Sequence, residues 1–244
     1  MALVQADPVG RWRSLTVVIL LMSLSLAGCF AGDDDVSSGT TSPAASRSDT
    51  GSAAEATPAD QQLSALAAKG VAAQFTGKYA LDSNDPAEPD ATVTIYRLAS
   101  SYRVDVIRGE ATSILMTATD GVVSCQVEVG RRTCLLVAAA GQQPPELFDP
   151  RLQRLFTTNL SALAAGAGAT VTAAGSLPAT GPMEAASCFQ AAGGAAEPGK
   201  YCLTAAGILR AAEFPSGVLE LTELSGPPAA DVFTPPATPT PLPS

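Results

Sequence analysis

The sequence predicts an α+β fold in which one large antiparallel sheet, an open half-barrel, curls around an inserted helix on its concave face. Three observations predict it: β-rich runs separated by short polar turns over residues 71–137, an amphipathic run after Asp149, and further β-rich runs over residues 183–225. Sequential strands with tight turns form an antiparallel meander. A sheet of about nine or ten strands must curl to bury one face, and the helix is expected to fill the space on its concave side.

An export signal opens the chain. Arg11 and Arg13 give it a positive start, and Leu15–Leu26 follows as an uncharged apolar run. That run suits a signal-peptide core and is shorter than the ~20 residues needed to span a bilayer. Because Trp12 separates the two arginines, the general secretory route is favoured over the twin-arginine route.

The end of this run, Leu26-Ala27-Gly28-Cys29, resembles the lipobox of bacterial lipoproteins. The resemblance implies cleavage before Cys29 and a diacylglyceryl group on its thiol. The alternative is an uncleaved membrane helix with an incidental cysteine, which the short apolar run disfavours. Two or three acyl chains anchor a protein firmly, at roughly 0.8 kcal/mol per buried methylene. We therefore expect a protein held at the extracytoplasmic face of the cell membrane by its lipid.

The segments on either side of the folded part have low-complexity compositions. Residues 30–57 are mostly Ser, Thr, Ala, Gly and Asp, which indicates a disordered tether. Residues 235–243 are rich in proline, which predicts an extended polyproline II tail that enters neither helix nor sheet. The predicted segments are a signal peptide at 1–28, a lipidated tether at 29–57, the half-barrel domain at 58–234 and a Pro-rich tail at 235–244.

A short helix opens the folded part. Thr57 and Pro58 have the pattern of an N-cap and a first-turn proline, Leu63 and Ala67 share one face, and Gly70 is the expected end. Six strands are then predicted, at Val71–Leu81, Ala91–Leu98, Tyr102–Ile107, Thr112–Thr119, Gly121–Val129 and Thr133–Val137.

A second helix is predicted after Asp149, which offers a capping side chain, and Pro150, which suits the first turn; Gly166 is the expected end. Its apolar residues recur at helical spacing, at Leu152, Leu155, Phe156, Leu160 and Leu163. Four closing strands are predicted at Met183–Gln190, Tyr201–Ala205, Ile208–Phe214 and Val218–Ser225.

Four cysteines remain once Cys29 is assigned to lipid, and an oxidising compartment favours two disulfides among them. Three pairings are possible. The local pairs Cys125–Cys134 and Cys188–Cys202 are favoured, because each pair brackets a turn that brings strand ends together. A four-cysteine zinc site is the rival, but the two-to-four residue spacing of such sites is missing.

Composition excludes several classes of function. The formal net charge of −9, without a basic cluster, argues against nucleic-acid binding and against electrostatic docking on anionic lipids. The sequence has no histidine, which removes Ser-His-Asp triads, Cys-His dyads and histidine metal sites. We expect neither catalysis nor a cofactor.

An acidic cluster between two predicted strands invites a calcium interpretation, since hard cations bind several oxygens. Pro86 and the absence of a suitably placed glycine break the EF-hand spacing, so a solvated turn fits better. The cluster comprises Asp82, Asn84, Asp85, Glu88 and Asp90.

Three motifs carry a resemblance to a known family: Tyr102–Val106 in an early strand, Asp120-Gly121 before the next hairpin, and Asp231–Pro236 near the end. With the order of elements, they resemble the lipoprotein-carrier superfamily (LolA/LolB-like) and its lipid-binding relatives among actinobacterial lipoproteins. Such proteins form an open half-barrel whose concave face and helix enclose an apolar cavity for acyl chains. They act as carriers or sensors. The two expected disulfides and the Pro-rich tail depart from this pattern.

The resemblance implies a lipid or other apolar small molecule in a cavity lined by Met116, Leu155, Phe156 and Leu160. Ordinary core packing explains the same four residues. The alternative function is therefore a non-catalytic interaction, sensor or scaffold lipoprotein with a filled core and no ligand. The membrane is the expected partner, through the anchor, and the sequence indicates no particular protein partner.

Overall fold

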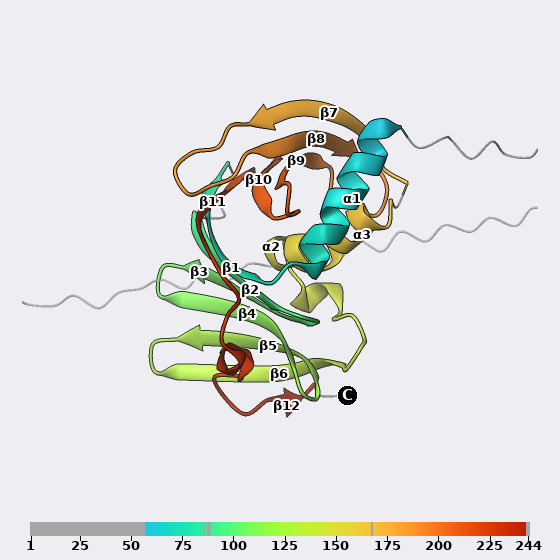
Figure 1. The fold of residues 1–244 in the computed structure, drawn as a ribbon. Helices are drawn as coiled ribbons and strands as arrows, with labels where there is room; N and C mark the ends of the chain where they lie inside the picture. Colours follow the sequence, from blue (N-terminus) through green and yellow to red (C-terminus); the bar gives the residue numbers. More distant parts are fainter. Residues whose placement is uncertain (1–56, 85, 87–88, 167, 243–244) are drawn as a thin grey trace, which may run out of the picture. The chain divides into compact units, whose positions relative to one another are not determined.

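Twelve strands form one curved sheet whose two edges, β7 and β12, do not meet (Figure 1). The computed structural model describes residues 57–84, 86, 89–166 and 168–242. The predicted signal peptide, Cys29 and most of the tether lie outside these residues. The α+β open half-barrel predicted from the sequence is confirmed.

The strands alternate direction across the sheet, except that β12 runs parallel to β6. Their order is β12-β6-β5-β4-β3-β2-β1-β11-β10-β9-β8-β7. In chain order the strands are β1 (Phe75–Ser83), β2 (Ala91–Leu98), β3 (Ser101–Arg108), β4 (Ala111–Ala118), β5 (Gly121–Glu128), β6 (Arg131–Ala139), β7 (Thr170–Leu177), β8 (Ala186–Ala192), β9 (Gly199–Thr204), β10 (Leu209–Phe214), β11 (Gly217–Ser225) and β12 (Thr240–Pro241).

Helix α1 (Pro58–Ala72) begins as the sequence predicts. The Thr57 hydroxyl accepts the Asp60 N–H at 3.2 Å, and the Asp60 carboxylate accepts the Thr57 N–H at 2.7 Å, which completes a capping box. Gly70 does not end the helix. It lies against the backbone of Gly207 in the β9–β10 turn, where a Cβ on Gly70 would overlap the Gly207 carbonyl oxygen.

The inserted helix lies where the sequence predicts it, on the concave side of the sheet (Figure 1). It is built from α2 (Arg151–Arg154), a π turn η2 (Leu155–Asn159) and α3 (Leu160–Ala164), preceded by the 3₁₀ turn η1 (Glu146–Phe148). The predicted Asp149 cap is wrong, because Pro150 occupies the N-cap. The Asp149 carboxylate instead accepts the hydroxyl of Thr157 in the π turn, at 3.1 Å.

The main core lies between α1, α3 and the concave face of β1, β2 and β8–β11. Alternate residues of each strand enter it, as period-two strands require. Tyr79 is fully buried there; its hydroxyl donates to the Leu209 carbonyl at 2.9 Å, and its ring centroid is 4.9 Å from that of Phe156. The inserted helix therefore plugs this part of the half-barrel with side chains.

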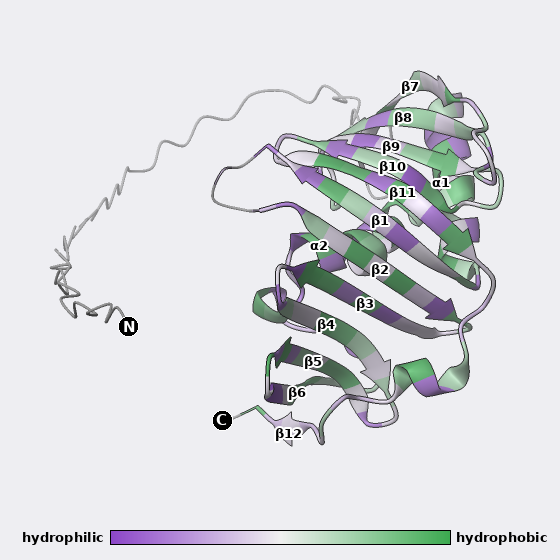
Figure 2. Cartoon of the chain, turned by 90° about the vertical axis from the view of Figure 1, so that its left-hand side faces the viewer, coloured by the Kyte–Doolittle hydropathy of each residue, from purple (hydrophilic) through white to green (hydrophobic). Residues whose placement is uncertain are grey.

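Both predicted disulfides are present. Cys125–Cys134 joins directly opposed residues of β5 and β6, and Cys188–Cys202 does the same in β8 and β9. Their Cα separations of 4.1 and 4.0 Å are those of closely spaced cross-strand pairs. By strand alternation both lie on the convex face, the side of the sheet towards the viewer in Figure 2.

The prediction that the Pro-rich tail stays out of the sheet is wrong. Thr240 and Pro241 form β12, which pairs with Leu135 and Leu136 of β6. An edge strand tolerates a proline because one side of its backbone needs no ladder partner. The tail is thus part of the fold as far as the structure describes it.

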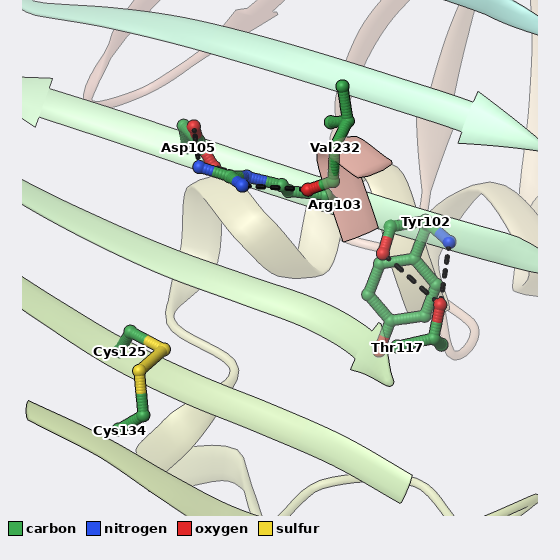
Figure 3. Close-up of polar contacts among 7 residues, drawn as sticks. All are labelled: Tyr102, Arg103, Asp105, Thr117, Cys125, Cys134 and Val232. Atoms are coloured by element: carbon green, nitrogen blue, oxygen red, sulfur yellow. Dashed lines mark hydrogen bonds and ion pairs between the residues drawn. A yellow bond between two sulfur atoms is a disulfide. The ribbon is translucent and has the colours of Figure 1, made fainter. Parts of the chain in front are cut away.

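Arg103 holds the segment before the tail against the convex face (Figure 3). Its guanidinium pairs with both Asp105 oxygens at 2.7 and 2.8 Å, and donates at 2.8 Å to the carbonyl of Val232 in the 3₁₀ turn η3 (Ala230–Phe233). Phe233 and Ala237 then pack on the cluster that contains Cys125–Cys134. The Arg103–Asp105 pair is largely buried.

Candidate functional site

A hollow of about 500 Å³ opens on the concave face at one end of β2–β5, and we call it the β2–β5 hollow. Its floor is a row of side chains from neighbouring strands: Arg97, Tyr102, Thr117 and Val122. The β6–η1 connection, including residues 140–144, forms one wall. Residues of η2 and α3, namely Thr157, Thr158 and Ser161, form the other.

Strand register places the floor residues side by side. Arg97 of β2 is directly opposite Tyr102 of β3, and Thr117 of β4 is opposite Val122 of β5. The Thr117 hydroxyl joins the two pairs, because it accepts the Tyr102 N–H at 2.9 Å, as drawn in Figure 3. Antiparallel pairing between strands that the sequence predicts therefore places the four floor side chains in one row. That this row lines a hollow is not evident from the sequence.

Arg97 is the charged member of the floor. It is 8% exposed, and burial lowers the pKa of its guanidinium. One nitrogen donates to the Val71 carbonyl in the last turn of α1 at 3.4 Å, and another donates to the Phe156 carbonyl in the π turn. A guanidinium stays protonated at any physiological pH, so Arg97 places a positive charge beneath the hollow.

Tyr102 and Asp149 complete the polar chemistry near the hollow. Burial, reinforced by the negative charge of Asp149, raises the pKa of Tyr102 to about 12, so its phenol is a neutral donor at pH 7. Burial raises the pKa of Asp149 to about 6, against the opposing effect of the Thr157 hydroxyl. The Thr157 hydroxyl, which borders the hollow, donates to the Asp149 carboxylate at 3.1 Å.

The four residues proposed from the sequence as a ligand lining lie elsewhere. Leu155, Phe156 and Leu160 are buried in the main core. Met116 is fully buried on the convex face, with Ile114 and the Cys125–Cys134 disulfide. The structure does not bring Met116 together with the other three, and none of the four borders the hollows described here.

Other hollows are smaller or more open. One of about 280 Å³ lies over β4–β6 beside Phe148 and Gln153, and one of about 150 Å³ lies between α1 and α3. A wider depression of about 740 Å³ lies at the opposite end of β1 and β2, with Asp82 and Asp90 in its lining. It is shallower than the β2–β5 hollow, and it has acidic groups where that hollow has a cation.

Where the structure describes the acidic cluster, its residues form a hydrogen-bonded turn. The Asp90 carboxylate accepts the Ser83 N–H at 3.0 Å, and Asn84 N–H donates to the Ser216 carbonyl at 2.8 Å. Asp85 and Glu88 lie outside the described residues. Over residues 57–242, with the gaps given above, no three His, Cys, Asp or Glu side chains gather as a metal site. Within the same residues no helix has the length and apolar character to span a bilayer.

No family model matches the chain, and no curated protein matches its sequence significantly. Fifteen chains of solved structures match the fold. Among them is the crystal structure of MucB, with a TM-score of 0.41 and 17% sequence identity, over 73% of this chain and 63% of that one. The chain thus spans less than two thirds of MucB, and a likeness at this level assigns it neither family nor function.

Proposed function

We propose that this chain is an extracytoplasmic lipoprotein, anchored through lipid on Cys29, whose half-barrel binds a lipid or other apolar small molecule. The observation that carries the proposal is the β2–β5 hollow of about 500 Å³ on the concave face. Sites for small molecules are concave and typically enclose about 300–1,000 Å³. The main core, by contrast, is packed with side chains around Tyr79 and Phe156.

The lining of the hollow suits an amphipathic ligand better than a wholly apolar one. Tyr102 and Val122 offer carbon surface along the floor and Pro144 along one wall, while Ser100 and Thr158 bring hydroxyls to the borders. A molecule with an acyl chain and a polar head matches this division, because each part would lie against groups of its own kind.

The proposed extracytoplasmic location is supported by the sequence features before the described residues and by the disulfides. Disulfides form and persist outside the cytoplasm, and both pairs are geometrically matched across neighbouring strands. The absence of histidine from the sequence supports binding over catalysis.

A second function is favoured by a different observation. The helices cover the concave face of β1 and β8–β11, and the core there is a continuous cluster of buried apolar side chains. A filled half-barrel suits a sensor or scaffold lipoprotein that contacts another protein through its outer surface. This alternative requires that the β2–β5 hollow hold only water.

Native mass spectrometry of the full-length protein, extracted from its membrane in mild detergent, separates the two functions. Ligand binding predicts an added mass beyond the N-terminal lipid, at one copy per chain. The variant Ala140→Trp, which places a large side chain at the border of the hollow, should lose that mass. The control Thr172→Trp, at an exposed site on the other face of the sheet that borders none of the hollows, should keep it. Parent protein carrying only its own lipid would overturn the binding function.

The anchor has a separate test. Labelled palmitate should enter the wild-type protein and be lost in Cys29→Ser, which should also move the protein from the membrane fraction to the soluble one. A Cys29→Ser protein that fractionates with the membrane as the wild type does would contradict the anchor and leave the ligand proposal intact.

A further inference from the structure

The guanidinium of Arg97 has no anionic partner among the described residues, although it is 8% exposed. Its two hydrogen bonds go to the neutral carbonyls of Val71 and Phe156. Carbonyl acceptors satisfy N–H groups but do not cancel the net charge. The last carbonyls of α1 carry only the partial negative charge of a helix end, roughly half an elementary charge. A buried cation in this setting keeps a strong preference for an anion.

Three other partly buried arginines differ from Arg97 in this respect. Arg103 pairs with Asp105, Arg151 with Glu197 and Arg154 with Glu146. Arg97 is also the one of these four that lies in the floor of the β2–β5 hollow. The arginine without an anionic partner is therefore also the one that faces the β2–β5 hollow.

Tyr102 adds a second donor at the same place. It lies directly across from Arg97 in the β2–β3 register and lines the same hollow. Its phenol oxygen makes no hydrogen bond to any described residue, so its O–H is free to donate. The Thr157, Thr158 and Ser161 hydroxyls opposite already point to a carboxylate or to backbone carbonyls. Because the Thr117 hydroxyl also donates to a carbonyl, Arg97 and Tyr102 are the donors that the floor of the hollow leaves available.

We propose that the ligand of the β2–β5 hollow is an anionic amphiphile whose carboxylate or phosphate head lies between Arg97 and Tyr102. Its acyl chain runs along the carbon surface of Val122 and Pro144. This inference rests on the proposed binding function and adds the ligand's charge and the two residues that recognise it. Arginine suits such a head because its planar fork donates two parallel hydrogen bonds to a carboxylate or phosphate.

A displacement assay on the full-length protein tests the charge directly. A dansyl-labelled fatty acid is bound first, and palmitate, hexadecyl phosphate and hexadecanol then compete for it. These competitors share one acyl chain and differ in the head. We expect the better of the two anions to displace the probe at least about ten times more effectively than the alcohol, and the ranking of palmitate and hexadecyl phosphate identifies the head.

Two variants locate the effect. Arg97→Gln should bring both anions to the level of hexadecanol, and Tyr102→Phe should weaken the anions about three- to ten-fold while leaving the alcohol unchanged. The control Arg132→Gln removes the same charge from an exposed position of β6 and should retain the full preference. Selectivity that survives in Arg97→Gln would overturn the assignment.

The parent protein gives a decisive result even if Arg97→Gln does not fold. Equal displacement by palmitate, hexadecyl phosphate and hexadecanol would overturn the anionic head while leaving amphiphile binding in place. Failure of the dansyl probe and of all three competitors to bind would instead overturn the proposed function itself.

Discussion

The two halves of the sheet are covered in different ways. In the helix-covered half, β1 and β7–β11, the concave face packs against α1 and α3 and forms the main core. In the tail-covered half, β3–β6 and β12, the convex face is covered by η3 and the chain after it. The concave side of that second half keeps the β2–β5 hollow and the smaller one beside Phe148.

The comparison shows that helices cover one part of this sheet and that the C-terminal segment covers the other part. A sheet needs one buried face to be stable. Where the helices supply the cover, the concave face is filled with side chains. Where Phe233 and Ala237 cover the convex face, the concave face keeps a small buried cluster of Leu115, Val122 and Val137, with the β2–β5 hollow beside it.

The largest expected effect breaks the helix-covered half. Gly207 has φ of +80°, and a Cβ there would overlap the Leu66 carbonyl oxygen of α1. Gly207→Ala should cost about 4 kcal/mol of unfolding free energy, measured by denaturant titration, because both the backbone and the helix contact are strained. The matched control is Gly141→Ala in the open half, with φ of +78° and nothing within 4 Å. It should cost about 1 kcal/mol. Equal losses would show that α1 is not packed tightly against the β9–β10 turn.

The next effect breaks the tail-covered half. Arg103→Met leaves Asp105 largely buried without its cation, and removes the bond to Val232. We expect a loss of about 2 to 3 kcal/mol and faster proteolysis at the C-terminal segment. The double variant Arg103→Met, Asp105→Leu removes the stranded charge and should recover most of the stability, but not the protection of the segment. Unchanged proteolysis in both variants would contradict the role of Arg103 as an anchor.

Asp149, at the start of the inserted helix between the two halves, predicts a pH effect. Its pKa is about 6 in the folded chain, above the ~3.9 of an unfolded aspartate. The folded state therefore binds the proton more tightly, and this contribution to stability is complete below about pH 4 and is lost as the pH rises through 6. Asp149→Asn should stabilise the protein by about 1 to 2 kcal/mol at pH 7 and change little at pH 4. A variant that is less stable at pH 7 would show that the carboxylate is needed in its charged form.

The smallest effect sharpens the comparison at the tail. Phe233 is half-buried on the convex cluster, so Phe233→Ala should cost about 1 kcal/mol. Leu147→Ala, at a leucine that is 83% exposed on the concave side, should change the unfolding free energy by less than about 0.5 kcal/mol. Two equal values, measured by urea titration, would mean that the tail does not cover the sheet in solution.

Features set by neighbouring residues were predictable from the sequence. The Thr57 cap, the two disulfides and the positions of most strands depend on turn chemistry and on period-two patterns within a few residues. Features set by distant contacts were not. β7 is rich in Ala and Gly and has little intrinsic strand preference, and β12 exists only because β6 offers it an edge.

The candidate site could not be read from the sequence for a related reason. Ile114, Leu115 and Met116 are consecutive, apolar and buried, so alternation alone does not tell which of them faces the helix. Leu115 turns to the concave side and Met116 to the tail. Arg97 in turn looks like an ordinary polar residue at a strand end, and only the fold gives it a buried position beneath a hollow.

Photo-crosslinking with a diazirine-bearing palmitate, followed by peptide mapping, tests most directly whether the open concave half holds a ligand. The account predicts labelled peptides from both walls of the β2–β5 hollow, around Gln142 and around Thr158, and protection by excess palmitate. Label confined to the convex face, or label that excess palmitate does not reduce, would contradict it.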